Sequence, residues 1–333
     1  MKKMKINIII LVLVSFIVVF FSVKDNFNSV VDYFVNVNYF WIFVACGLYI
    51  LNILFQSLAQ YNFLREVKPD YKKRSCFKLM TMAMFFNGIT PFSSGGQPFQ
   101  VYFLRKEGFK VSDSSNSLLQ NFITYQFALI LMGTIALVSN IYLEIIPENL
   151  ILRRIVIIGY IINISIMALI IFLSRGKKTN TKIFNKFFNF IFKFKFIKNK
   201  EEKKEKASRL LDEFYNSTAI MKNNFRNTML SFTYNILSLL CLYAIPLFIF
   251  LALGSEDLTL INSLVLSGYT FLIGSFVPIP GGSGGLEYAY TTFFGVMFSG
   301  GLLSASMLLW RMITYYLGMV IGGLTLIAYR KKE

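Results

Sequence analysis

Long apolar runs with few or no charged residues dominate this sequence. Several approach or exceed the roughly 20 residues that a helix needs to cross a bilayer. Of the 333 residues, 55% are hydrophobic and 17% are aromatic. These features predict an all-α, polytopic membrane protein in which residues 1–333 form a single membrane domain. We expect six full transmembrane helices, at Ile6–Val23, Tyr39–Leu64, Ser117–Val138, Ile155–Leu173, Thr228–Leu253 and Leu302–Tyr329.

The first of these runs also resembles a secretory signal, because lysines precede it. It is long for a signal peptide, and residues 21–24 offer no cleavage site of the small-x-small type. We therefore expect an uncleaved membrane helix.

The net charge is +17, from 34 Lys and Arg against 17 Asp and Glu. The charged residues lie mainly in the loops between the apolar runs. Residues 65–74 form a basic loop, which the positive-inside rule keeps in the cytoplasm. This places both chain termini in the cytoplasm of a multi-pass protein of the cell membrane. The remaining Lys and Arg fit this layout, apart from a few that fall outside or within a span: Lys24, Arg153, Arg154 and Arg311.

The main cytoplasmic segment, residues 174–227, is strongly basic. Within it, Lys182 and Lys186 fall on one face of an expected helix, and Phe184 and Phe188 fall on the opposite face. Such a helix suits the headgroup region of a membrane. Packing against the protein's own membrane helices is an equal alternative. The phenylalanines argue against nucleic acid as a partner.

The sequence also excludes several kinds of chemistry. It contains no histidine, which removes Ser-His-Asp hydrolysis and His-ligated zinc. Cys46, Cys76 and Cys241 are scattered and suggest neither a disulfide framework nor a CxxC metal site. We expect no metal and no cofactor.

Two stretches rich in glycine and proline interrupt apolar segments, at residues 87–98 and 276–287. Because such a break leaves backbone groups unpaired, it is tolerated in a membrane only where protein or a wet cavity surrounds it. From the charges of the flanking loops, we expect the first break to be a re-entrant hairpin that enters from the cytoplasm. We expect the second break to be a re-entrant hairpin that enters from the outside. The two breaks resemble an inverted pseudo-repeat of the kind found in secondary transporters. The expected total is about eight membrane segments.

Glu287 and Arg311 are the only ionisable residues that we place inside the membrane. Intramembrane charges are costly and usually pair or line a cavity. We expect the two to pair with each other, either as a structural pair or facing a substrate.

The helix that restarts after Ser283, Gly284 and Gly285 has unpaired N–H groups and a positive dipole end, which suit a phosphate. A lipid phosphate is the obvious candidate in a membrane. The alternative is that Glu287, in the first turn, satisfies those donors itself.

The motif Pro278-x-Pro280-Gly281-Gly282-x-Gly284-x-x-Glu287, Arg311 in the last span, and Thr90-Pro91-x-x-x-Gly95-Gly96-x-Pro98 followed by Tyr102-x-Leu104-Arg105 resemble one family. It is the lysylphosphatidylglycerol synthase transmembrane-region family of flippase-like membrane proteins. The resemblance implies movement of a charged lipid across the bilayer, which in larger members lowers susceptibility to cationic antimicrobial peptides. It implies a substrate-binding site at Asn87, Thr90, Pro91, Gly95, Gly96, Gln97, Arg105, Pro280, Gly281, Gly282, Ser283, Gly284, Gly285, Glu287 and Arg311.

Two departures from the family pattern bear on function. The chain ends at Glu333, without the aminoacyl-transferase domain of larger members, so lysyltransferase catalysis is not expected. Gln97 and Gln100 stand where the family often carries an acidic residue and an arginine.

The leading hypothesis is therefore a protein that binds and translocates an anionic or aminoacylated phospholipid, such as lysylphosphatidylglycerol, or another lipid-linked headgroup. The alternatives are an aminoacyl-lipid synthase and an accessory subunit of a separate synthase. The expected partners are membrane lipids, and a separate lipid-modifying enzyme and a second copy of the chain stay open.

Overall fold

The computed structural model describes residues 24, 26–90, 95–146, 150–174, 205, 216–217, 219–221, 223–274 and 284–330. This part of the chain is helical and contains no strand, which confirms the all-α prediction. Its helices are α2 (Phe27–Val35), α3 (Tyr39–Val67), α4 (Lys73–Gly88), α5 (Gly96–Lys106), α6 (Val111–Leu143), α7 (Leu150–Ser174), α10 (Phe225–Ala252), α11 (Leu260–Gly274), α12 (Gly285–Phe294), α13 (Gly300–Arg311), the π-helical turn η3 (Met312–Tyr316) and α14 (Leu317–Arg330).

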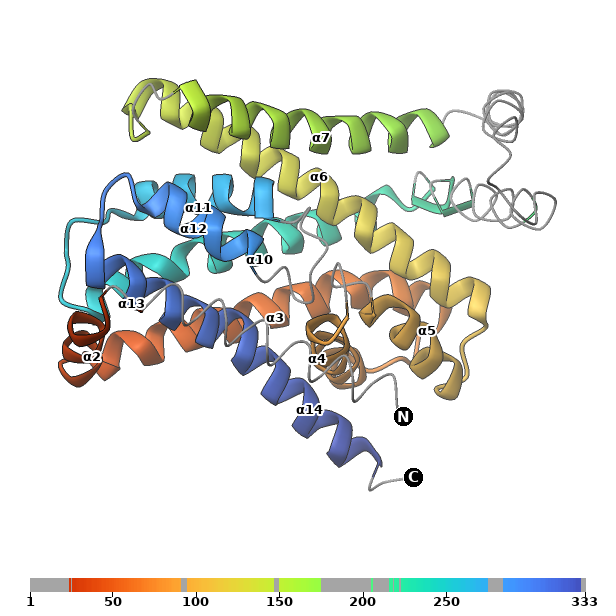
Figure 1. Cartoon of the computed structure of the whole chain (residues 1–333). Coiled ribbons are helices and arrows are strands. Elements are labelled where there is room, and N and C mark those ends of the chain that lie inside the picture. Colours follow the sequence, from red (N-terminus) through yellow and green to blue (C-terminus); the bar gives the residue numbers. More distant parts are fainter. Residues whose placement is uncertain are drawn as a thin grey trace, which may run out of the picture.

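An antiparallel pair, α3 and α10, forms the centre of the molecule (Figure 1). At one end of the pair the Asn38 N–H donates to the Ala252 carbonyl at 2.8 Å. Further along, the buried Asn52 amide donates to Ser238 Oγ at 2.8 Å. Hydrogen bonds of this kind hold membrane helices together where the hydrophobic effect cannot.

Helices α4 and α5 form the first hairpin. Close to its tip, the rings of Phe86 and Phe99 stack with centroids 3.4 Å apart. At its base, residues from the start of α4 and the end of α5 share a buried cluster with Leu64, near the end of α3. The chain thus leaves the hairpin beside the point where it entered.

Helices α11 and α12 form the second hairpin. The rings of Tyr269 and Phe293 lie 5.5 Å apart in its middle, and the Asn262 amide reaches Met297 Sδ at its base. The base packs on Phe250, near the end of α10.

A proline in α10 creates hydrogen-bonding positions at which the second hairpin binds. Pro246 has no N–H, and its ring disturbs the local helical bonding. A serine of α11 supplies hydrogen bonds to the backbone beside this proline. Ser263 Oγ donates to the Tyr243 carbonyl at 2.8 Å and accepts from the Leu247 N–H at 3.3 Å.

The two hairpins start from opposite ends of the α3 and α10 pair, because the end of α3 lies beside the start of α10. Figure 1 shows α4 and α5 toward one end of the molecule and α11 and α12 toward the other. Their tips approach the same helix from the two sides, as the contacts of Arg311 and Tyr315 show below.

That helix runs from Gly300 to Arg330 as α13, η3 and α14. Its α14 part packs closely against α4 at Gly322, where a Cβ would collide with the Thr81 carbonyl, and a Cβ on Gly318 would collide with the Tyr49 hydroxyl of α3. Small residues spaced by four allow membrane helices to approach closely in this way.

Four helices are long and apolar enough to cross a membrane: Tyr39–Val67, Val111–Leu143, Phe225–Ala252 and Gly300–Tyr329. They coincide with four of the predicted spans. A fifth predicted span falls in α7, which contains the shorter apolar stretch Val156–Ser165. The expected span Ile6–Val23 and most of the basic segment 174–227, with its amphipathic helix, lie outside the described residues.

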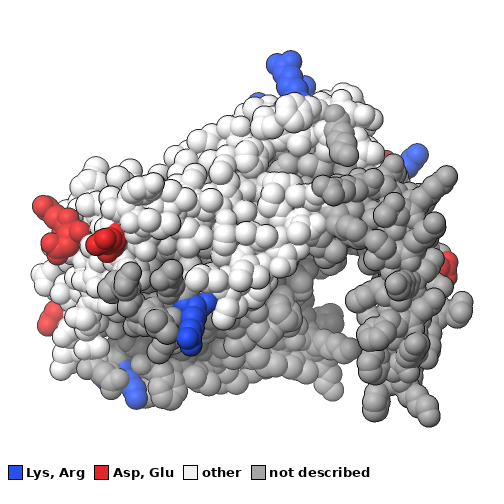
Figure 2. Space-filling model, turned by 90° about the horizontal axis from the view of Figure 1, so that it is seen from above, with Lys and Arg blue, Asp and Glu red and all other residues white. Residues whose placement is uncertain are grey.

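The surface has the character of a membrane protein. Large apolar side chains of the long helices are exposed, among them Phe43, Ile141 and Leu324. In Figure 2 the visible acidic side chains gather mainly at the left-hand end, where α2 lies in Figure 1.

Candidate functional site

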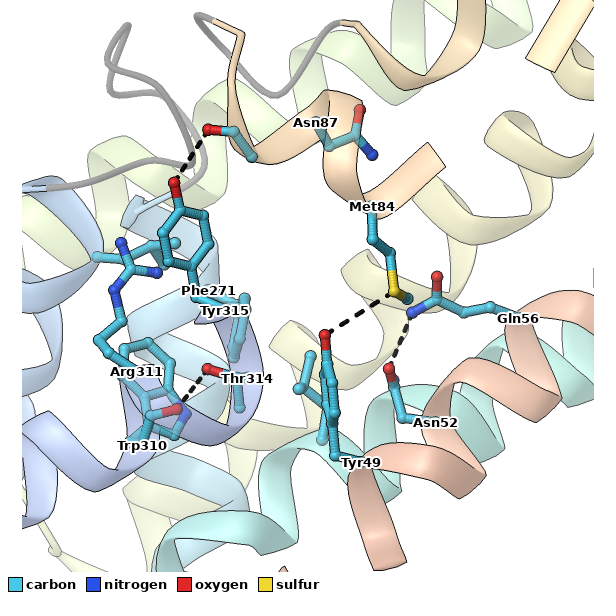
Figure 3. A pocket seen from close by; sticks show the side chains of 13 residues that line it. Tyr49, Asn52, Gln56, Met84, Asn87, Phe271, Trp310, Arg311, Thr314 and Tyr315 are labelled. Carbon is cyan, nitrogen blue, oxygen red and sulfur yellow. Dashed lines mark hydrogen bonds between the residues drawn. The ribbon is translucent and has the colours of Figure 1, made fainter. Parts of the chain in front are cut away.

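A cavity of about 220 Å³ lies between α3, α4 and the segment from Trp310 to Tyr315 (Figure 3). This volume is well above the roughly 10–15 Å³ that one water needs. Arg311 is the only charged residue among the described residues that line it. The lining residues are Tyr49, Asn52, Gln56, Met84, Asn87, Gly88, Leu242, Phe271, Leu286, Trp310, Arg311, Thr314 and Tyr315.

Arg311 pairs with Glu287, as the sequence predicts. Arg311 Nε donates to Glu287 Oε1 at 2.6 Å, and the two residues are only 5% and 7% exposed. The other carboxylate oxygen, Oε2, accepts the N–H of Gly284 at 2.7 Å. Glu287 therefore does two things: it neutralises Arg311 and caps the helix that restarts after the second break.

Gly284 is suited to this cap by its backbone. Its φ is +87°, a region that residues with a Cβ rarely adopt. The alternative in which Glu287 satisfies the restarting helix is thus realised for the Gly284 donor. Glu287 stands at the third position of α12, where an acid also suits the positive end of the helix dipole.

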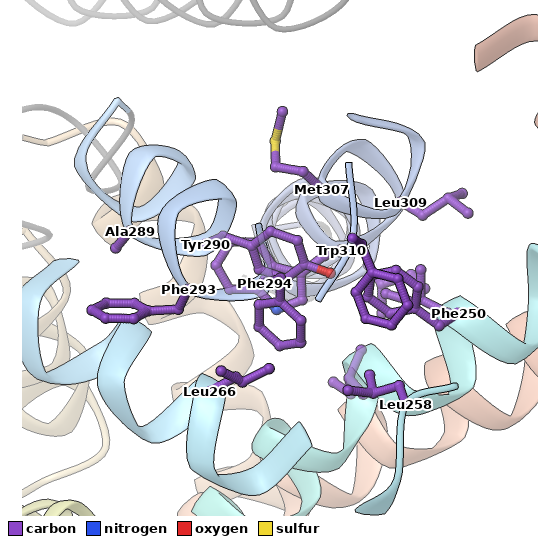
Figure 4. Packing of buried hydrophobic residues seen from close by; sticks show 14 of the residues in the cluster. Phe250, Leu258, Leu266, Ala289, Tyr290, Phe293, Phe294, Met307, Leu309 and Trp310 are labelled. Atoms are coloured by element: carbon purple, nitrogen blue, oxygen red, sulfur yellow. The ribbon is translucent and has the colours of Figure 1, made fainter. Parts of the chain in front are cut away.

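Aromatic packing between α12 and α13 places the ion pair. The Tyr290 and Trp310 rings stack with centroids 4.7 Å apart, and Tyr290 also stacks on Phe294. Figure 4 shows these rings in the buried cluster between the two helices. Tyr290 lies one turn after Glu287, and Trp310 directly precedes Arg311. The stack of the two rings therefore keeps the two charged side chains within contact distance of each other.

The π-helical turn begins directly after Arg311. Such turns within α-helices occur frequently at functional sites. The guanidinium of Arg311 lies 4.7 Å from the ring centroid of Tyr315, and the Tyr315 hydroxyl donates to the Gly88 carbonyl at 2.9 Å. Gly88 ends α4, so Arg311 and Tyr315 connect the tip of the second hairpin to the tip of the first.

Side chains also satisfy the restarting helix at the first break. Asn87 Oδ1 accepts the Gly96 N–H at 2.8 Å, and Thr90 Oγ1 accepts the Gly95 N–H at 2.8 Å. A Cβ at Gly95 would lie 2.5 Å from Thr90 Cγ2, and one at Gly96 would collide with the Asn87 amide. These glycines are therefore required by the close approach of the caps.

The residues expected at the site divide into four groups. Glu287, Arg311, Gly284 and Gly285 come together at the start of α12, and Asn87, Thr90, Gly95 and Gly96 come together at the first break. Gln97 and Arg105 are exposed on α5 and are not among the lining residues. The expected site residues Pro91, Pro280, Gly281, Gly282 and Ser283 lie outside the described residues.

Sequence reasoning missed the α3 wall of the cavity and the residues after Arg311. Asn52 and Gln56 lie one helical turn apart on α3, and Gln56 Nε2 donates to Asn52 Oδ1 at 3.1 Å. Their signal was present, since amides spaced by four in an otherwise apolar span indicate a polar stripe. Thr314 and Tyr315 follow Arg311 within a turn and carried no comparable signal.

The described residues bring no three Cys, Asp or Glu side chains together, and we assign no set of metal ligands.

Comparison with curated proteins gives no match for this chain. The family described as the lysylphosphatidylglycerol synthase TM region matches residues 7–322, nearly the whole chain. This match confirms the resemblance that the two glycine-rich motifs indicate. The chain therefore belongs to the lysylphosphatidylglycerol synthase TM region family.

Proposed function

We propose that this protein binds the headgroup of a phospholipid or another lipid-linked phosphate in the cavity beside Arg311 and moves it between the two leaflets. The lipid is anionic or aminoacylated. The observation that carries the proposal is a cavity with polar and apolar walls between the tips of two helical hairpins, in which Arg311 is the one charged residue among the described lining residues.

In this proposal both hairpins are re-entrant and enter from opposite faces of the cell membrane, with the chain termini in the cytoplasm. Support comes from their bases, which lie at opposite ends of the α3 and α10 pair. Sites in secondary transporters form near the midplane from discontinuous helices arranged in this way.

The roles of the residues follow from their charge. The guanidinium of Arg311 has five N–H donors in a planar fork, which suits the oxygens of a phosphate. The start of α12, at Gly284 and Gly285, adds the positive end of a helix dipole. Glu287 holds Arg311 in place and limits the net charge of the site when the lipid is absent.

The test uses the purified full chain in vesicles that contain tail-labelled phosphatidylglycerol, with dithionite quenching to report movement between leaflets. We expect Arg311→Ala to slow movement at least tenfold. The exposed Arg154 offers a matched control, and Arg154→Ala should move lipid at the wild-type rate.

A double variant separates a substrate role from a structural one. Glu287→Gln alone leaves Arg311 buried without its carboxylate, which costs about 3–5 kcal/mol of stability. Glu287→Gln with Arg311→Gln removes both charges and restores the stability. We expect this double variant to fold and still not move lipid, whereas recovery of wild-type movement would mean that the pair is structural only.

A further inference from the structure

We infer that the cavity selects a phosphodiester lipid with an uncharged, hydroxyl-rich headgroup, of the phosphatidylglycerol type, and rejects a cationic aminoacyl headgroup. This inference rests on the proposed function, because it specifies which lipid the same cavity accepts.

The charges around the cavity disfavour a cationic headgroup. A lysyl headgroup brings ammonium groups, which need carboxylates when they leave water. No described lining residue is acidic. Among the described residues, Glu287 is the acid that contacts Arg311, and each of its carboxylate oxygens already accepts a short hydrogen bond, one from Arg311 and one from Gly284.

The two break segments outside the described residues, 91–94 and 275–283, contain no charged residue in the sequence. They therefore contain no carboxylate either. An ammonium group in this cavity would meet Arg311, a charge of its own sign.

Aromatic rings do not replace the missing carboxylate. Trp310 and Tyr315 are rings that could hold a cation, but the guanidinium of Arg311 already lies over them, 5.7 Å and 4.7 Å from the ring centroids. A second cation at these rings would again lie close to Arg311.

The opposite wall suits hydroxyl groups. Figure 3 shows Asn52, Gln56 and Asn87 across the cavity from Arg311. Asn52 is already bonded to Ser238 and Gln56, and Asn87 Oδ1 to Gly96. The Gln56 Oε1 acceptor and the Asn87 Nδ2 donor remain to meet hydroxyls, which both donate and accept. A phosphate beside Arg311 would thus place a glycerol or similar polyol against these amides.

The experiment compares two tail-labelled lipids, phosphatidylglycerol and lysylphosphatidylglycerol, in vesicles with the purified full chain. We expect phosphatidylglycerol to move between leaflets at least ten times faster. Equal rates, or faster movement of the lysyl lipid, would overturn the inference and leave the proposed function standing. Movement of neither lipid would refute the proposed function and the inference with it. Uptake of soluble glycerol phosphate in place of lipid movement would also overturn the inference.

A variant reverses the expected selectivity. Gln56→Glu adds a carboxylate to the amide wall at nearly constant volume. We expect it to raise the rate for lysylphosphatidylglycerol relative to phosphatidylglycerol at least tenfold. Asn223→Asp is the control, because Asn223 is exposed and does not line the cavity, and this added carboxylate should leave the ratio unchanged. An unchanged ratio in Gln56→Glu would contradict the inferred role of this wall.

Discussion

At the scale of single residues, Tyr315 is the link between the two hairpin tips. Its ring faces Arg311, which binds the second hairpin through Glu287, and its hydroxyl binds the carbonyl at the end of α4 in the first hairpin. A lipid phosphate that draws Arg311 away from Glu287 would therefore disturb both tips.

Tyr315→Phe tests this link. The variant keeps the ring and removes the hydroxyl donor to Gly88, so we expect a stability loss of about 0.5–1.5 kcal/mol and slower lipid movement. Thermal unfolding and the leaflet assay measure the two effects. Tyr142→Phe is the control, because Tyr142 is 81% exposed. Wild-type behaviour of Tyr315→Phe in both assays would show that the link has no role.

The pairing of Glu287 with Arg311 could be predicted, because an apolar chain leaves few partners for two intramembrane charges. The contact of Tyr315 with Gly88 could not, because it depends on the rotation that the π-helical turn gives the last helix. A single sequence with aromatic residues throughout its spans does not indicate which of them faces a cavity.

At the scale of helices, the contact of α14 with α4 fixes the first hairpin beside the cavity. A Cβ on Gly322 would collide with the Thr81 carbonyl and lie 3.0 Å from the Phe85 nitrogen. The neighbouring Gly323 has more space, and its nearest contact would be Phe85 Cδ2 at 3.6 Å.

This difference between adjacent glycines gives a matched pair of variants. We expect Gly322→Ala to lower stability by about 1–3 kcal/mol, the usual cost of overpacking, and to slow lipid movement. Gly323→Ala should keep or raise stability, because alanine favours a helix by about 1 kcal/mol over glycine. Thermal unfolding of the two variants measures both effects, and equal stabilities would contradict the packing described for α14.

The helices themselves were largely predictable, since apolar length marks membrane spans. Their ends were less so: the predicted first break begins at Asn87, yet α4 continues to Gly88 and α5 starts at Gly96. The caps from Asn87 and Thr90 explain the difference, because they satisfy the restarting helix across a shorter gap. Between the first two predicted spans lies α2, a short helix that apolar length alone does not predict.

At the scale of the whole molecule, the proposal requires each hairpin to enter and leave by the same membrane face. Single cysteines at exposed positions near the hairpin bases, in a chain without its native cysteines, test this. We expect Asp257→Cys and Ser299→Cys to react with an impermeant reagent outside the cell. Asp70→Cys and Lys110→Cys should react only after the membrane is opened. Labelling of Asp257→Cys and Ser299→Cys from opposite faces would show that the second hairpin crosses the membrane.

The most direct test of the central claim is an experimental structure of the full chain in a phosphatidylglycerol bilayer disc. We expect headgroup density in the cavity, with a phosphate within hydrogen-bonding distance of the Arg311 guanidinium and its polyol facing Asn52, Gln56 and Asn87. Lipid density confined to the outer surface of the helices, with only water beside Arg311, would contradict the account.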